Sequence, residues 1–273
     1  MLYNVTMQRT TVVDRIVREL AVAILRGERT PGSMLPQVRA LAARYTVTLP
    51  TIQRVVAQLE AMGLVAAHQG RGTMVLDPAR RGDGSLLPLQ IEAFRDQPDR
   101  AATLVADFLE LRRALAQLVV ARIVRSALPV AELHAALEGA VTRLETAAAQ
   151  GGDCDAVAAA DLAFARALID SAEQTAYAGV FNLLERLVWD VPTLRQAMYA
   201  RPEENAGALR LFLTQWAAGV AADELAGLLE LLLTEADRRT VEGFRASLVT
   251  ELERPAAGVS EAAGSRHRKD APC

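Results

Sequence analysis

The sequence predicts a mainly α-helical fold: an N-terminal winged helix-turn-helix followed by a larger all-α bundle of six or seven helices. Three observations lead to this prediction. Apolar residues recur at helical spacing through most of the chain, two short β-like runs flank a glycine-rich turn near residue 70, and no convincing strand follows them. The length of 273 residues favours about two domains.

The first 76 residues predict three helices and a hairpin. Val13, Ile16, Val17 and Leu20 show the helical spacing of the first helix, and Gly27 follows as a stop signal. The expected elements are helices at 10–27, 36–45 and 50–62, and a hairpin of runs 64–67 and 73–76 joined by the turn 68–72. Three helices and a hairpin in this order are typical of a winged helix.

The rest of the chain reads as a linker, a helical domain and a tail. Pro, Gly, Ser and Arg dominate residues 77–88, whereas residues 89–254 are rich in Leu and Ala with helical periodicity. Helix breaks are expected near Pro98, Pro129, Gly151 with Gly152, Pro192, Pro202 and Gly219. We therefore predict domains at 1–76 and 89–254, a linker at 77–88, and a disordered tail at 255–273.

Charge is unevenly distributed. The formal net charge is only −3, yet residues 1–80 hold ten Arg against five Asp or Glu. A basic module on an acidic body indicates a local site for a polyanion. The single lysine, Lys269, lies in the tail, so no lysine in the folded region could form a Schiff base or grip a phosphate loop.

The positions of the cysteines and the lengths of the apolar runs indicate in which cellular compartment the protein resides. Cys154 and Cys273 are far apart in sequence, which gives no disulfide framework and no cysteine-rich metal site. Residues 1–9 lack the apolar stretch of a signal peptide, and no uncharged apolar run is long enough to cross a membrane. We expect a cytoplasmic protein without membrane association.

Four segments at matching spacing carry a family resemblance. Residues 24–36 read Ile-Leu-Arg-Gly-Glu-Arg-Thr-Pro-Gly-Ser-Met-Leu-Pro, 39–42 Arg-Ala-Leu-Ala, 59–65 Leu-Glu-Ala-Met-Gly-Leu-Val, and 70–73 Gly-Arg-Gly-Thr. Across about Val13 to Leu76 the sequence resembles the GntR family of transcription regulators. The resemblance implies a DNA-binding winged helix and no catalytic residues.

On this scaffold the start of the third helix would enter the major groove and the wing would contact the DNA beside it. The residues expected to contact DNA are Arg39, Thr48, Leu49, Pro50, Thr51, Gln53, Arg54, Gln69, Gly70 and Arg71. The Arg39 contact is carried over from the family. Leu49 and Gln53 stand where family members commonly carry Arg, and Thr46 replaces a usual Gly, which leaves the operator sequence open. The N-cap of the third helix is expected to be Thr48 or Leu49. Thr48 is the better candidate, because its hydroxyl oxygen can accept a backbone N–H of the first turn.

The second domain resembles the FadR-type helical domain of this family. The carrying segments are Phe108-Leu109-Glu110-Leu111-Arg112-Arg113-Ala114-Leu115, Asp161-Leu162-Ala163-Phe164-Ala165-Arg166 and Trp216-Ala217-Ala218-Gly219. In the metal-binding branch an Asp and three His hold an ion, but Ala165 stands at a His position here. We therefore expect no metal and no cofactor. A site rebuilt from acidic residues such as Asp107, Glu110 or Asp155 stays open.

A pocket for a small-molecule effector is expected in the helical domain. The candidates to line it are Arg112, Asp161, Arg166, Trp189, Arg195, Tyr199 and Trp216. An inward arginine would bind a carboxylate or phosphate, so an organic acid or an acyl-CoA is the expected class. Each candidate also has an ordinary structural explanation, such as a core tryptophan or a surface arginine.

The function expected from these features is a sequence-specific DNA-binding regulator, a repressor in the first instance. One winged helix reads few bases, so a homodimer on a pseudo-palindromic operator is expected. One alternative is a constitutive regulator whose helical domain only dimerises. A more remote alternative is an enzyme with a DNA-binding appendage, although residues 90–254 offer no nucleophile–base pair.

Overall fold

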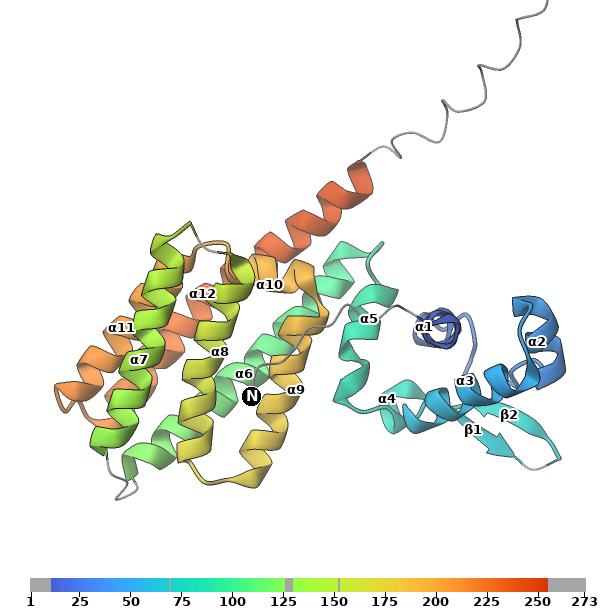
Figure 1. Cartoon of the computed structure of the whole chain (residues 1–273), viewed down its shortest axis with the longest axis horizontal. Helices are drawn as coiled ribbons and strands as arrows, with labels where there is room; N and C mark the ends of the chain where they lie inside the picture. The colour runs from blue at the N-terminus through green and yellow to red at the C-terminus, as the bar shows by residue number, and fades with distance from the viewer. Residues whose placement is uncertain (1–10, 69, 126–129, 152, 255–273) are drawn as a thin grey trace, which may run out of the picture.

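The computed structural model describes residues 11–68, 70–125, 130–151 and 153–254. The mainly helical fold class is confirmed: a small module with one two-stranded sheet precedes an all-helical region (Figure 1). The tail at 255–273 and Gln69 lie outside the described residues. Within the described part of the chain, no helix has both the length and the apolar character needed to cross a bilayer.

The N-terminal module contains α1 (Val12–Leu25), α2 (Val38–Tyr45), α3 (Leu49–Ala61), β1 (Val65–His68) and β2 (Gly72–Val75). A reciprocal capping box starts α1, where Thr11 Oγ1 accepts from the Asp14 N–H and Asp14 Oδ2 accepts from the Thr11 N–H. The strands pair antiparallel, with Val65 opposite Val75. Each element differs from its predicted bounds by one or two residues.

The core of this module lies where the three helices meet the hairpin. Its fully buried side chains include Ile16, Leu41, Ile52, Leu59 and Leu64. Leu86, which follows the hairpin in sequence, is also fully buried in this same core. The N-terminal module is therefore completed by a residue from the segment that was predicted as a linker.

That segment is structured. It contains α4 (Pro78–Arg81), a 3-10 helix (Gly84–Leu86) and the beginning of α5 (Leu87–Ala93). Asp77 and Asp83 cap the two short helices by accepting backbone N–H groups. Pro78 and Gly84 do begin short helices here, as expected of helix-boundary residues. The segment between them is nevertheless ordered, and its Leu86 packs into the core of the N-terminal module.

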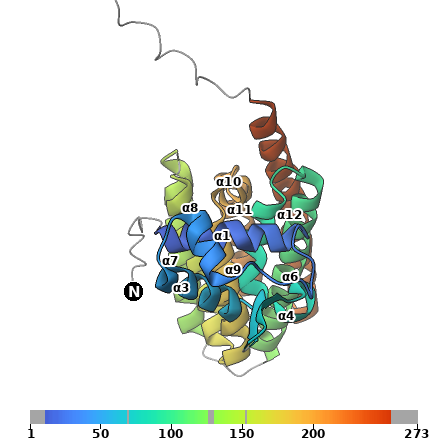
Figure 2. The same cartoon turned by 90° about the vertical axis from the view of Figure 1, so that its right-hand side faces the viewer.

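The second region is a bundle of seven helices, within the described residues, preceded by α5. Their bounds are α6 (Pro98–Arg125), α7 (Val130–Ala149), α8 (Cys154–Ser171), α9 (Thr175–Asp190), α10 (Pro192–Met198), α11 (Pro202–Ala217) and α12 (Ala222–Glu253). Arg95 pairs with Glu251 and Arg245 with Asp99, so α6 and α12 run antiparallel. Figure 2 shows α6 and α12 along one edge of the bundle and α7 along the other.

One helix break was missed by the sequence analysis. The chain turns between α8 and α9 at Glu173, which adopts a left-handed conformation with φ 52°. Glycine usually takes that conformation, and no Gly or Pro marks the turn. Expected breaks near Pro98, Gly151, Pro192, Pro202 and Gly219 do fall at helix ends.

The two regions contact each other through α1 and α5. Arg26 donates from Nε to the Ala93 carbonyl at 2.6 Å and from Nη2 to Asp96 at 2.8 Å. Arg18 pairs with Glu92 at 2.5 Å. Together with buried Leu86, these contacts fix the N-terminal module against the start of the bundle.

Candidate functional site

The predicted DNA-contacting residues sit at the exposed end of α3, on α2 and in the hairpin. Thr48, Pro50, Gln53 and Arg54 are exposed at the first turns of α3, and Leu49 is 42% exposed. Pro50, Gln53 and Arg54 share one side of the helix because they are three and four residues apart. A side that is polar, exposed and unpacked is available for a ligand as large as DNA.

The start of α3 has a partly unusual cap. Thr48 occupies the N-cap position with extended backbone, as its chemistry suggested, but its hydroxyl makes no bond to the helix backbone. The hydroxyl lies 2.9 Å from Thr51 Oγ1 instead. Pro50 has no N–H group, and the N–H groups of Thr51 and Ile52 donate to the Thr48 carbonyl at 3.1 and 3.3 Å, so the backbone of Thr48 rather than its side chain satisfies these two donors.

The turn before α3 depends on a strained residue. Thr46 ends α2 in the left-handed region with φ 54° and ψ 47°. A β-branched residue is rare in that region, which confirms why glycine is usual at this position. Thr46 thus lies at the junction between α2 and α3 with a conformation that its side chain disfavours.

The wing is tied to α3. Glu60 Oε1 accepts the backbone N–H of Ala67 at 3.0 Å, which links the end of α3 to β1. Gly70 and Gly72 adopt φ values of +76° and +103° at the tip, and Arg71 between them is exposed. No Cβ stands between the Gly70 backbone and an approaching molecule.

All three arginines among the predicted DNA contacts are exposed and remain available to an outside anion. Arg39, Arg54 and Arg71 form no ion pair within the described chain, whereas most other arginines are paired. An unpaired guanidinium at a surface can bind a phosphate without first breaking a salt bridge. This is the feature that separates them from Arg18, Arg26 and Arg44.

The bundle contains two adjoining cavities. The outer cavity, of about 550 Å³, lies mainly between α11 and α12, and the inner cavity, of about 90 Å³, lies among α6, α8, α9 and α10. Both are lined by Arg112, Asp161, Met198 and Tyr199. Three of the seven predicted effector residues, Arg112, Asp161 and Tyr199, are thus brought together where the cavities meet.

Burial is the main cause of the shifted pKa values of Asp161 and Tyr199 in this cluster. The Tyr199 hydroxyl donates to Asp161 Oδ2 at 2.8 Å. Burial raises the pKa of Asp161, against the lowering effects of the Tyr199 hydrogen bond and the Arg112 charge. The pKa of Tyr199 is raised by burial and by the neighbouring Asp161. The cluster therefore favours neutral forms of both side chains more than water does.

Arg112 is held by a residue that the sequence analysis did not single out. Asp237, only 3% exposed, accepts hydrogen bonds from Arg112 and Arg113. Asp237 could have been found from its spacing, since it falls four residues after Leu233 and seven before Phe244 on the inward side of α12. Arg112 Nε is buried without a hydrogen-bond partner in the described chain, so one donor in the cavity wall is unused.

The other four predicted effector residues lie elsewhere. Arg166 pairs with Glu185 at 2.5 Å and stacks on Phe181. Arg195 pairs with Asp155 at 2.7 Å and stacks on Trp189, and Trp216 packs edge-on against Phe212. Since Arg166, Trp189, Arg195 and Trp216 are engaged in these contacts, none of them lines either cavity.

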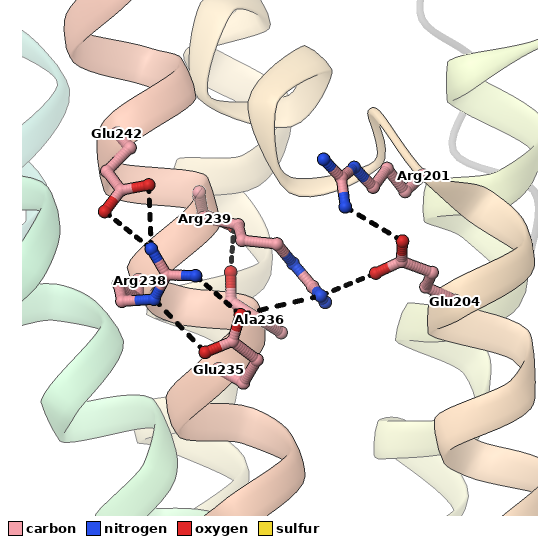
Figure 3. Close-up of polar contacts among 8 residues, drawn as sticks. Arg201, Glu204, Glu235, Ala236, Arg238, Arg239 and Glu242 are labelled. Carbon is pink, nitrogen blue, oxygen red and sulfur yellow. Dashed lines mark hydrogen bonds and ion pairs between the residues drawn. The ribbon is translucent and has the colours of Figure 1, made fainter.

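A network of ion pairs borders the outer cavity (Figure 3). Glu204 at the start of α11 pairs with Arg201 at 3.0 Å and with Arg239 of α12 at 2.6 Å. Arg239 also approaches Glu235, which pairs with Arg238. The network joins α11 to α12 at one end of a cavity that is otherwise lined largely by leucines.

Ala165, one helical turn after Asp161, lines the inner cavity where a histidine would be needed for a metal. Among the described residues, no group of three His, Cys, Asp or Glu side chains is arranged to hold an ion. The alternative acidic site is also not assembled, since Asp155 pairs with Arg195 on α10 while Asp107 and Glu110 are exposed on α6.

Comparisons with known proteins agree with the N-terminal module. Residues 12–75 match the model of the bacterial regulatory proteins of the gntR family. A protein of Mycobacterium tuberculosis, named an uncharacterised HTH-type transcriptional regulator, is 35% identical over 181 residues, covering 65% of this chain and 68% of that protein. An HTH-type transcriptional repressor of Bacillus subtilis is 30% identical over 71 residues, which are 26% of this chain and 55% of that protein.

The fold as a whole also has a solved counterpart. The structure of Lar, described as controlling expression of the Listeria monocytogenes agr system, superposes with a TM-score of 0.54. The match covers 85% of this chain and 97% of that one at 15% sequence identity. At that identity the likeness concerns the fold.

Proposed function

The chain belongs to the GntR family of bacterial regulatory proteins, and on that premise we propose a homodimeric repressor whose DNA binding responds to a small molecule held in the α6–α12 bundle. It is a DNA-binding transcription regulator, because its family and relatives are named so and none of these is named as an enzyme. Dimerisation, repression and the small molecule are the parts that we add.

DNA contact is assigned to the exposed residues of the N-terminal module. Arg39, Arg54 and Arg71 bind phosphates or groove edges, since they are exposed and unpaired within the described chain. Gln53 reads a base edge, because the first turns of a recognition helix reach into the major groove. Thr48 and Thr51 add hydroxyls at the helix end, and Leu49 and Pro50 give apolar contact.

The observation that supports a small-molecule effector is the meeting of two cavities at Arg112, Asp161 and Tyr199. The unused Arg112 N–H suits an acceptor such as a carboxylate, and the surrounding apolar lining suits a hydrocarbon body. An organic acid or an acyl-CoA has both parts. The FadR-type character of the bundle belongs to this same proposal.

The test uses an operator selected from random DNA and two probes, octanoate and octanoyl-CoA. We expect one probe to raise the melting temperature and to weaken operator binding by about tenfold or more. Arg112→Ala should remove this response, whereas the matched control Arg166→Ala, outside both cavities, should keep it. If neither probe changes the melting temperature or the operator affinity, the organic-acid and acyl-CoA effector is refuted and the constitutive regulator is favoured.

A further inference from the structure

The outward side of α6 carries exposed leucines that no other described part of the chain covers. Leu111 and Leu118 are 48% and 55% exposed, and Ala114 between them is exposed as well. Inward residues of the same helix, such as Leu109 and Val119, are almost fully buried. We define the α6 outer face as Asp107, Leu111, Ala114, Leu118 and Arg122.

The spacing of this face is that of a helix-pairing seam. Residues 111, 114 and 118 alternate steps of three and four, which keeps them on one stripe of an α-helix. A small residue between two leucines lets two helices approach closely. Helix α6 lies along the edge of the bundle that it shares with α12 (Figure 2), and the exposure of Leu111 and Leu118 makes this face accessible to another molecule.

The charges at the two ends of the stripe are opposite. Asp107 is exposed and forms no hydrogen bond or ion pair within the described chain. Arg122 is also exposed, and among the described residues its guanidinium makes one hydrogen bond, from Nε to the Ala172 carbonyl at 3.2 Å. The stripe therefore runs from a carboxylate, across apolar residues, to a guanidinium.

This order of residues is complementary to itself when reversed. If two copies of α6 pack antiparallel with the two-fold axis between positions 114 and 115, Leu111 of each copy faces Leu118 of the other. The same axis places Asp107 of each copy opposite Arg122 of the other. A parallel pairing would instead place Asp107 against Asp107 and Arg122 against Arg122, which repel.

We propose that the α6 outer face is the surface through which two copies of this chain dimerise, with the two α6 helices antiparallel. A two-fold interface uses the same patch on both subunits, which this face satisfies. The inference rests on the homodimer proposed above and assigns it to specific residues.

The first experiment measures oligomeric state by light scattering of the full chain at micromolar concentration. Leu118→Lys should give a monomer that keeps its helical circular dichroism, because two buried lysines would face the apolar seam. The matched control is Leu231→Lys on α12, which removes a 68% exposed leucine that lines the outer cavity, and it should remain a dimer.

The outcomes separate the two proposals. A dimeric Leu118→Lys variant, or a monomeric Leu231→Lys variant, would overturn the α6 interface while leaving the homodimer intact. A monomeric wild-type protein, with operator DNA present, would overturn the homodimer itself.

The second experiment tests orientation without touching the leucines. Asp107→Arg alone and Arg122→Asp alone each create two like-charge contacts per dimer, so each should raise the dimer Kd by about tenfold or more. The double variant exchanges the charges and should return the Kd toward the wild-type value. Failure of the double variant to recover, when both single variants weaken the dimer, would refute the antiparallel register, and unchanged single variants would refute the charge pairing.

Discussion

Gln53 and the unpaired arginines are the residues through which DNA binding can be tested. Arg39→Ala and Arg71→Ala should weaken binding to all sequences, because phosphate contacts carry little sequence information. Gln53→Ala should mainly relax base preference, since a good base contact is worth roughly 1–3 kcal/mol of discrimination. Titration of selected and scrambled operators by fluorescence anisotropy measures both effects, and unchanged binding in all three variants would refute the assigned surface.

Asp161 makes stability depend on pH. Burial raises its pKa above the ordinary value of 3.8, so the fold favours the protonated carboxyl. Its stabilising contribution is complete below that ordinary value and is lost as pH rises through the raised folded pKa. Asparagine does not titrate and can still accept the Tyr199 hydrogen bond.

The stability of Asp161→Asn relative to wild type should therefore increase between pH 4 and pH 7. Urea unfolding at several pH values measures the difference in free energy of unfolding. Asp170→Asn, at an exposed carboxylate on the same helix that forms no ion pair among the described residues, serves as the control. A relative stability that falls with pH would show that Asp161 is ionised and favourably paired in the fold.

At the scale of elements, the junction of α2 and α3 contains a residue whose backbone conformation lowers the stability of the fold. Thr46 holds φ 54°, which costs a β-branched residue roughly 1–2 kcal/mol, whereas glycine loses roughly 0.5–1 kcal/mol of backbone entropy on folding. Thr46→Gly should thus stabilise the protein by up to about 1 kcal/mol, measured by chemical unfolding. A loss of stability would mean that the Thr46 side chain makes a compensating contact.

Most elements could be predicted because local signals and tertiary packing agree. The helices α1 to α3 show clear apolar periodicity, and Gly27 and Gly63 do end α1 and α3 with positive φ. The turn at Glu173 could not be predicted, since glutamate gives no turn signal. The helical turns within residues 77–88 were hidden by a composition rich in Pro and Gly.

The candidate site was predictable only in part. Arg112, Asp161 and Tyr199 converge because α6, α8 and α10 pack around one point, whereas periodicity says nothing about which helices meet. Arg112, Arg166 and Arg195 each pair with a carboxylate on a neighbouring helix, but only Arg112 also lines the cavities. The sequence does not tell which of these ion-paired arginines faces a cavity, because that depends on how the helices pack.

At the scale of the whole molecule, regulation should not depend on divalent metals. Asp161 is a single carboxylate with Ala165 one turn later, and one charged ligand is too few for a closed protein site. Chelator treatment should leave the melting temperature and the operator affinity unchanged, and elemental analysis should find no stoichiometric ion. Bound zinc, nickel or manganese, or a chelator-induced drop of several degrees, would contradict this expectation.

The burial of Leu86 limits where the DNA-binding module can be separated from the rest of the chain. The match to the family model ends at residue 75, yet the core of that stretch is closed by a leucine beyond it. A fragment cut at Leu76, or a hybrid that joins this DNA reader to a different body at that point, would leave a hole of one leucine, at a cost of roughly 2–5 kcal/mol. Exchange of the reader between regulators would therefore have to carry the chain onward to Leu89, which packs against the same core.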